Sequence, residues 1–287
     1  MQEKNARLMI IFSMAIFGTV GLFVRNIPLA SGEIALYRAV LAAVLIAGYL
    51  IATRQKIPFR SIRKEIPLLL ASGIAMGFNW ILLFEAYNYT TVSVATLSYY
   101  FAPVIVTVVC PFLFREKVTV KQIVCFIMST VGIALITGIG DMNRDGRDMI
   151  GILFGLGAAG LYASVVLVNK FIKNVDGIHR TFLQFFAAIV VLIPYVAVTS
   201  GVNLGTLDGS GWVFLLVIGL VHTGVTYCMY FSALREVPGQ KAAILSYIDP
   251  LVAVLVSVRV LGETMTVWQG IGGAMILGFT LWNELTD

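Results

Sequence analysis

Charged residues lie inside long apolar stretches of this chain, where burying a charge is costly and usually marks a functional position. Arg38 lies about six residues into an apolar run that begins near Gly32, which is about 9 Å along a helix. Asp249 lies beside Pro250 in the middle of another run. An arginine at such a depth can bind an anionic group, and an aspartate can bind a proton or a cation.

Each of these two residues also has a structural interpretation. Arg38 could form an ion pair with Glu33 or Glu85, or bind a backbone carbonyl, instead of holding a substrate carboxylate. Asp249 could cap the backbone that the following proline frees, or pair with Lys241. The sequence leaves both alternatives open.

Three further residues are candidates for coupling transport to a proton or cation. Glu33 and Glu85 fall at the ends of their apolar runs, where they could line an acidic vestibule or be solvated helix ends. His222 falls near the middle of its run and is either a site residue or a hydrogen-bonded packing residue.

Aromatic and amide side chains form the largest candidate group. Tyrosines away from helix ends need partners for their hydroxyls, so they tend to face one another or water. Together they would form an amphipathic pocket for amines, amino acids or aromatic metabolites; ordinary core packing is the alternative. The candidates, with Arg38, are Asn79, Trp80, Tyr99, Tyr100, Tyr162, Tyr227 and Tyr247.

Sequence motifs of common enzymes are missing. The chain has no G-x-x-x-x-G-K-[ST] loop, no H-E-x-x-H and no G-x-S-x-G, so we expect no enzyme, no cofactor and no metal site. Gly155, Gly157 and Gly160 spell G-x-G-x-x-G, but no strand precedes them and we discount a dinucleotide site. The three cysteines lie in apolar runs and form no disulfide or metal pattern.

Composition places the elements that carry these residues in a bilayer. The chain is 59% hydrophobic and 12% charged, with a mean hydropathy of +0.92, whereas a soluble domain carries about 25% charged residues. A membrane helix needs about 20 apolar residues. Such runs predict an all-α integral membrane protein with ten transmembrane helices. They cover residues 8–25, 32–52, 66–87, 92–113, 119–138, 150–170, 178–199, 211–232, 239–260 and 266–283.

Lysine and arginine between these helices predict the orientation, since cytoplasmic loops carry the excess. With the N-terminus inside, the inner segments hold Lys4, Arg7, Arg54, Lys56, Arg60, Arg63, Lys64, Arg115, Lys117, Lys121, Lys170, Lys173, Arg180, Arg235 and Lys241. The outer segments hold only Arg25, Arg144, Arg147 and Arg259. We therefore expect both termini in the cytoplasm and a multi-pass protein of the plasma (inner) membrane. The net charge of +5 is explained by topology, and we expect no nucleic-acid partner.

The chain also contains an internal repeat at an offset of 147 residues. Ala86, Ala95, Tyr100, Pro103, Glu116, Thr119 and Gln122 recur as Ala233, Ala242, Tyr247, Pro250, Glu263, Thr266 and Gln269. We predict two five-helix repeats, 1–142 and 143–287. Because five is odd, the second repeat would cross the membrane inverted relative to the first, the architecture of alternating-access transporters.

These features resemble the drug/metabolite transporter superfamily, and specifically its EamA-type ten-helix members, over nearly the whole chain. A proline followed 13 residues later by a glutamate closes each repeat. The residues that carry the resemblance are Ser98-Tyr99-Tyr100, Pro103, Arg115-Glu116-Lys117, Tyr37-Arg38-Ala39, Tyr247, Asp249-Pro250 and Leu261-Gly262-Glu263.

The resemblance implies secondary active transport, frequently export, of amino acids, amines or related metabolites. It also implies a central cavity formed by helices one, three, four, six, eight and nine. Glu116 and Glu263 would cap and dock helix ends. We expect a small-molecule substrate, protons or another coupling ion, a lipid bilayer, and a monomer or homodimer. Carriage of a sugar phosphate or other organic anion, a channel, and a non-transporting scaffold remain as alternatives.

Overall fold

The computed structural model describes residues 3–57, 59–114, 119–137, 146–175, 177–234, 236–237 and 245–285. Within these ranges every regular element is a helix. Seven helical segments in this part of the chain are long and apolar enough to cross a membrane. The predicted spans 119–138, 239–260 and 266–283 also contain helices, but their described portions are shorter or less apolar.

The helices of the first half follow the predicted spans closely. They are α1 (Glu3–Gly18), α2 (Val20–Arg25), α3 (Ser31–Ala52), the short α4 (Phe59–Ile62), α5 (Ile66–Tyr89), α6 (Val92–Tyr99), α7 (Ala102–Phe114) and α8 (Val120–Thr137).

The second half repeats this order. Its elements are α9 (Gly146–Asn169), α10 (Gly177–Thr199), the 3₁₀ turn η1 (Leu204–Thr206), α11 (Gly209–Leu216), the π-helix η2 (Val217–Val225), α12 (Thr226–Leu234), α14 (Ile248–Arg259) and α15 (Val267–Leu285). Asp208 caps α11, since its carboxylate accepts the Gly211 N–H at 2.7 Å. This bond lowers the pKa of the exposed Asp208 carboxyl below its ordinary value.

Two residues of the sequence repeat form the same local structure in both halves. Thr119 and Gln122 bond each other's backbone N–H groups before α8, at 3.2 and 2.9 Å. Thr266 and Gln269 make the same reciprocal pair before α15, at 3.2 and 2.8 Å. Each pair satisfies two amides that a helix start leaves unbonded.

Breaks in the predicted spans also recur. The span 92–113 is interrupted at Tyr100 between α6 and α7, and Tyr247 is the corresponding turn before α14. In each case the repeated proline, Pro103 or Pro250, falls in the first turn of the helix that follows. Proline is tolerated there because the first-turn N–H groups have no helical acceptor.

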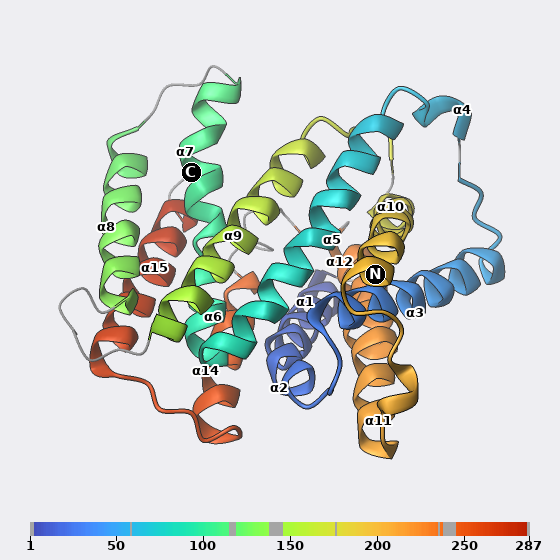
Figure 1. Cartoon of the computed structure of the whole chain (residues 1–287). Coiled ribbons are helices and arrows are strands. Elements are labelled where there is room, and N and C mark those ends of the chain that lie inside the picture. Colours follow the sequence, from blue (N-terminus) through green and yellow to red (C-terminus); the bar gives the residue numbers. More distant parts are fainter. Residues whose placement is uncertain are drawn as a thin grey trace.

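The helices pack into one bundle in which the two halves of the chain alternate (Figure 1). α5 lies between α9 and α10, and α3 packs against α10 and η2. α1 contacts α12 and α14, while α8 and α15 form a pair at one edge. The largest buried cluster includes Trp80, Phe84 and Phe185 and draws residues from both halves. The core therefore lies between the halves.

Glycines allow some of these helices to meet along their backbones. A Cβ on Gly73 of α5 would lie 2.7 Å from the Cβ of Ala187 on α10. A Cβ on Gly132 of α8 would lie 2.7 Å from the carbonyl oxygen of Gly272 on α15. Only glycine permits both approaches without displacement, as is common between membrane helices.

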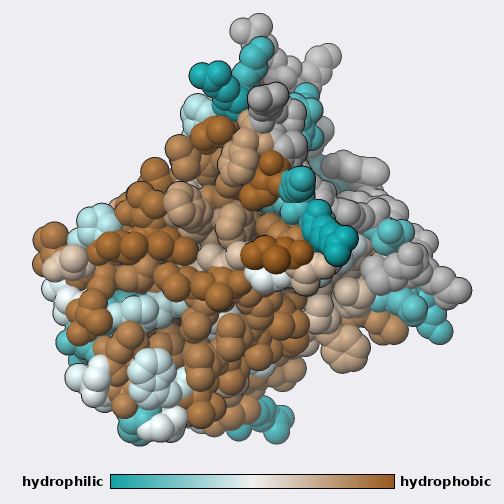
Figure 2. All heavy atoms as spheres, turned by 90° about the vertical axis from the view of Figure 1, so that its right-hand side faces the viewer, coloured by the Kyte–Doolittle hydropathy of each residue, from teal (hydrophilic) through white to brown (hydrophobic). Residues whose placement is uncertain are grey.

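The outside of the bundle is apolar. Figure 2 shows hydrophobic side chains over most of one face, with hydrophilic residues gathered toward its upper and lower ends. Val44 and Leu153, for example, are 67% and 60% exposed in the middle of α3 and α9. Trp212, Trp268 and Trp282, near helix ends, are also exposed, as expected of residues at the membrane interface.

Candidate functional site

Arg38 is buried within the bundle, only 4% exposed, and has no carboxylate partner in the part of the chain that the structure describes. Its Nε donates to Thr223 Oγ1 on η2 at 3.0 Å. The guanidinium lies over the rings of Trp80 and Phe84, at 4.7 and 5.2 Å from their centroids. Cation–π contact stabilises the charge but leaves the Nη donors available for an anion.

The predicted ion pair of Arg38 with Glu33 or Glu85 is therefore not formed. Glu33 accepts the backbone N–H of Asn203 at 2.7 Å and its side-chain amide at 3.0 Å. Glu85 accepts the Ser31 hydroxyl at 2.6 Å. Both carboxylates are engaged near the ends of α3 and α5, because hydroxyl and amide donors there satisfy them locally.

Aromatic rings extend from Arg38 through the bundle. Trp80 meets Phe185 of α10 edge to face at 5.3 Å between centroids, and Phe185 meets Tyr227 of α12 in the same way at 5.3 Å. Tyr227 in turn contacts Phe17 of α1 at 5.2 Å. Two predicted residues, Trp80 and Tyr227, thus lie in one aromatic group with Arg38.

A second group gathers around Asp249 at the start of α14. The Tyr100 hydroxyl donates to Asp249 Oδ2 at 2.7 Å. Tyr99 lies 5.9 Å from the Tyr100 ring and 5.4 Å from the Tyr162 ring of α9. Asn79 bonds the Ala158 carbonyl at 2.7 Å. The structure thus brings together predicted residues from four helices.

Two further tyrosines belong to the group around Arg38. Tyr87 stacks near Phe84, whose ring lies under the Arg38 guanidinium, and Tyr227 contacts Phe185. Asp249 has no cationic partner among the residues that the structure describes; Lys241, its predicted alternative partner, lies outside them. Within the described residues, a cation and an anion thus lie inside the bundle, and neither has an ion-pair partner.

The π-helix η2 positions His222 and Thr223 side by side. His222 Nε2 lies 2.8 Å from the hydroxyl of Thr19, the residue between α1 and α2, and Nδ1 lies 3.2 Å from the Val217 carbonyl. The ring also meets Phe23 at 4.7 Å between centroids. His222 is thus bonded through both nitrogens and ties η2 to the break in the first span.

Sequence reasoning overlooked several members of the site. Trp80, Phe84 and Tyr87 follow the i, i+4, i+7 spacing of one helix face, which could have added the last two to the candidates. Phe185 next to Gln184, and Thr223 next to His222, carried no comparable signal. Tyr247 lies in the turn before α14. The described residues hold no cluster of three or more potential metal ligands.

Comparison with known proteins identifies relatives of the whole chain. The model of the EamA-like transporter family matches residues 4–138 and again 149–283. An uncharacterized transporter of Bacillus subtilis, YxxF, is 30% identical over 276 residues, covering 96% of this chain and 88% of its own. An uncharacterized transporter of Archaeoglobus fulgidus is 30% identical over 283 residues, covering 96% and 95%. A crystal structure at 15% identity matches the fold, with a TM-score of 0.66 and 99% of both chains covered.

Fold, surface and comparisons together define a multi-pass, all-helical membrane transporter built from two repeats. The chain belongs to the EamA-like transporter family, with one family unit in each half. The resemblance found in its motifs is confirmed, as is the prediction that it is not an enzyme.

Proposed function

We propose that the protein is a secondary active exporter of zwitterionic, amino-acid-like metabolites. In this proposal the repeats are inverted, both termini are cytoplasmic and the path between them opens alternately to either side. The observation that carries the proposal is the pair of charges inside the bundle, Arg38 over the Trp80 and Phe84 rings and Asp249 at the Tyr100 hydroxyl, neither with an ion-pair partner among the described residues.

A zwitterion matches both charges at once. Its carboxylate would meet the Nη donors of Arg38, and its ammonium would meet Asp249 and the tyrosine faces and hydroxyls around it. A substrate with a single charge would leave the opposite protein charge uncompensated in a poorly hydrated site, which is costly. An organic anion is the second candidate because Arg38 alone favours it, but Asp249 opposes a net negative cargo.

Three ligands that share one ring test this charge pattern. Purified protein in liposomes, loaded with labelled phenylalanine, is challenged outside with phenylalanine, phenethylamine or 3-phenylpropionate. We expect saturable exchange in which phenylalanine competes at least about tenfold better than the singly charged analogues, or about 1.4 kcal/mol. Linear, non-saturating flux would indicate a channel, and no flux with any of a broad panel of amino acids, amines and acids would indicate a scaffold.

Single substitutions then test which protein charge binds the carboxylate of the substrate and which binds its ammonium group. Arg38→Gln should lose the preference for the amino acid over the amine, because the carboxylate has lost its partner. Asp249→Asn should lose the preference for phenylalanine over 3-phenylpropionate, because the ammonium group has lost its partner. If both variants keep the wild-type order of the three ligands, the two charges do not bind the substrate.

A further inference from the structure

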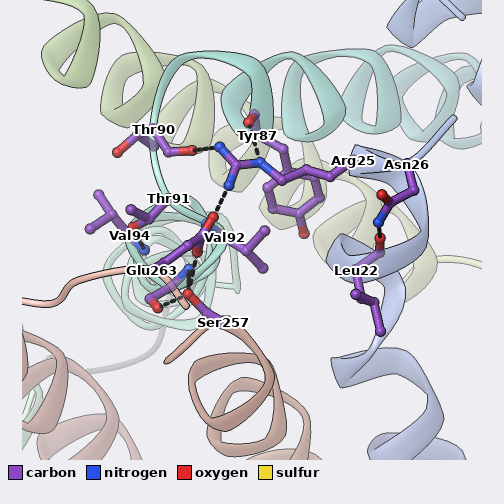
Figure 3. A network of polar contacts seen from close by, with 11 residues as sticks. Leu22, Arg25, Asn26, Tyr87, Thr90, Thr91, Val92, Val94, Ser257 and Glu263 are labelled. Atoms are coloured by element: carbon purple, nitrogen blue, oxygen red, sulfur yellow. Dashed lines mark hydrogen bonds and ion pairs between the residues drawn. The ribbon is translucent and has the colours of Figure 1, made fainter. Parts of the chain in front are cut away.

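The predicted outer end of the bundle carries a polar cluster that joins the two halves of the chain. Glu263 follows α14, and its carboxylate forms an ion pair with Arg25 at the end of α2. The same carboxylate accepts the Ser257 hydroxyl and, at 2.8 Å, the backbone N–H of Val92 in the first turn of α6. Figure 3 shows these contacts converging on one side chain.

Arg25 extends the cluster to α5. Its Nε donates to the Tyr87 carbonyl at 3.1 Å, and Nη2 donates to the Thr90 carbonyl at 3.2 Å (Figure 3). The Ser93 hydroxyl bonds Ser257, which adds a further link between α6 and α14. The Arg25–Glu263 ion pair and its hydrogen bonds therefore connect α2, α5, α6 and α14 at this end of the bundle.

The cluster is tightly packed at this end of the bundle. The Glu263 side chain is only 8% exposed, whereas Arg25 is 33% exposed and marks the outer rim. Behind the cluster, Gly21 of α2 packs directly on Val92, since a Cβ there would overlap its side chain. α6 also packs on α14 at this end. Tyr99 and Asp249 lie at the opposite ends of α6 and α14 from this cluster.

We propose that Arg25 and Glu263 form a latch that holds the outer end of the transport path closed and must separate before the path opens outward. This inference rests on the proposed function, since a latch has meaning only for a carrier that alternates. Both residues act by positioning helices, because neither lies among the aromatic rings or charges of the candidate site. Contacts made in only one conformation favour that conformation by the free energy they contribute.

Labelling of one reporter cysteine tests the latch without a substrate. Thr96 lies one helical turn from Val92 on α6, is 5% exposed and lies on the inner side of the latch. In a variant with Cys110, Cys125 and Cys228 replaced by alanine, Thr96→Cys is exposed to an impermeant maleimide from the outside. We expect Arg25→Gln and Glu263→Gln each to speed labelling at least about tenfold, because the closed population falls.

Two matched variants serve as controls. Asp208→Asn removes an exposed charge from the same side, away from the latch. Lys170→Gln removes a cation from the predicted inner side, at the end of α9. Neither should speed labelling from outside.

Unchanged outer labelling in both latch variants, with yield and melting temperature like the parent, would overturn the proposal. Where Glu263→Gln lowers the yield, Arg25→Gln alone decides, because the capping bond of Glu263 to Val92 remains. Arg25→Lys should restore slow labelling by keeping the cation. Failure of the ligand panel above would leave this result intact, so the two proposals fail separately.

Discussion

A charged side chain inside the bundle needs partners that stabilise it, and this need explains the residues around Arg38 and Asp249. Arg38 is stabilised by two rings and one hydroxyl, and Asp249 by one phenol. These partners hold the charges without neutralising them. The polar groups at helix ends differ: Glu33 and Glu85 are satisfied by nearby amide and hydroxyl donors. Their coupling role stays a prediction, and their contacts favour a structural one.

Removing an aromatic ring should weaken binding. Tyr99→Ala and Trp80→Ala each delete a ring that faces a neighbour across the site, so we expect at least about tenfold weaker competition by phenylalanine. Purified yield and melting temperature check folding. Phe12→Ala is the control, since this side chain is 60% exposed. Normal transport by both site variants would exclude the aromatic pocket.

Replacing Asp249 should alter the response of transport to pH. If this carboxylate exchanges a proton during the cycle, flux through the wild-type protein varies with pH, and Asp249→Asn, which cannot titrate, gives a flatter profile. Initial rates in liposomes between pH 5 and 9 provide the measurement. Identical profiles for the two proteins would remove Asp249 from coupling while leaving its binding role to the ligand panel.

At the scale of elements, the sequence predicted where helices run but not how they are interrupted. The apolar runs located α3, α5, α9 and α10 within a few residues. Gly18 precedes the break at Thr19, and the π-helix η2 contains Gly219 and Gly224, but single glycines within apolar runs do not predict an interruption. His222 bonds the Thr19 hydroxyl, and Thr223 bonds both Arg38 and the Ile218 carbonyl five residues back. Such local widening is frequent at functional sites.

The sequence also predicted only part of the candidate site. Depth in an apolar run was enough to select Arg38, Trp80, Tyr99 and Asp249, which do gather in two neighbouring groups. Partners such as Phe185 and Thr223 could not be chosen, since apolar helices are rich in phenylalanine and threonine that only pack. Membrane burial identifies costly residues, whereas their neighbours depend on how helices cross.

The contact between α1 and α14 gives a prediction at this scale. A Cβ on Gly18 would lie 2.6 Å from the Asp249 carbonyl oxygen and 2.7 Å from Val252 Cβ. Gly18→Ala should therefore displace α14 at the start of the site, at a cost of about 1–3 kcal/mol, and lower exchange severalfold. Gly48→Ala on α3, where nothing lies within 4 Å, should leave both stability and exchange unchanged. Equal behaviour of the two variants would contradict the predicted role of this contact.

At the scale of the molecule, the sequence predicted two repeats because seven identities recur at one offset without a gap. The family match, which covers both halves, confirms the two repeats. The boundary at residues 142 and 143, the inverted orientation and the oligomeric state stay predictions. The charge bias between loops supports the orientation, since translocating lysine and arginine is unfavourable.

Cysteine labelling can decide the orientation. In the cysteine-free variant, Asp208→Cys should react with an impermeant reagent added to intact cells, because its loop is predicted to lie outside. Lys56→Cys should react only after permeabilisation. The opposite pattern would reverse the topology and place the Arg25–Glu263 latch on the cytoplasmic side.

The glycine contact between α8 and α15 bears on how such a molecule could move. Where Gly132 meets the carbonyl of Gly272, main chain packs directly on main chain, which leaves little room for sliding. These two helices should therefore travel as a unit at the edge of the bundle. Tilting would then fall to the segmented helices, which already carry interruptions at Thr19, Tyr100 and Tyr247.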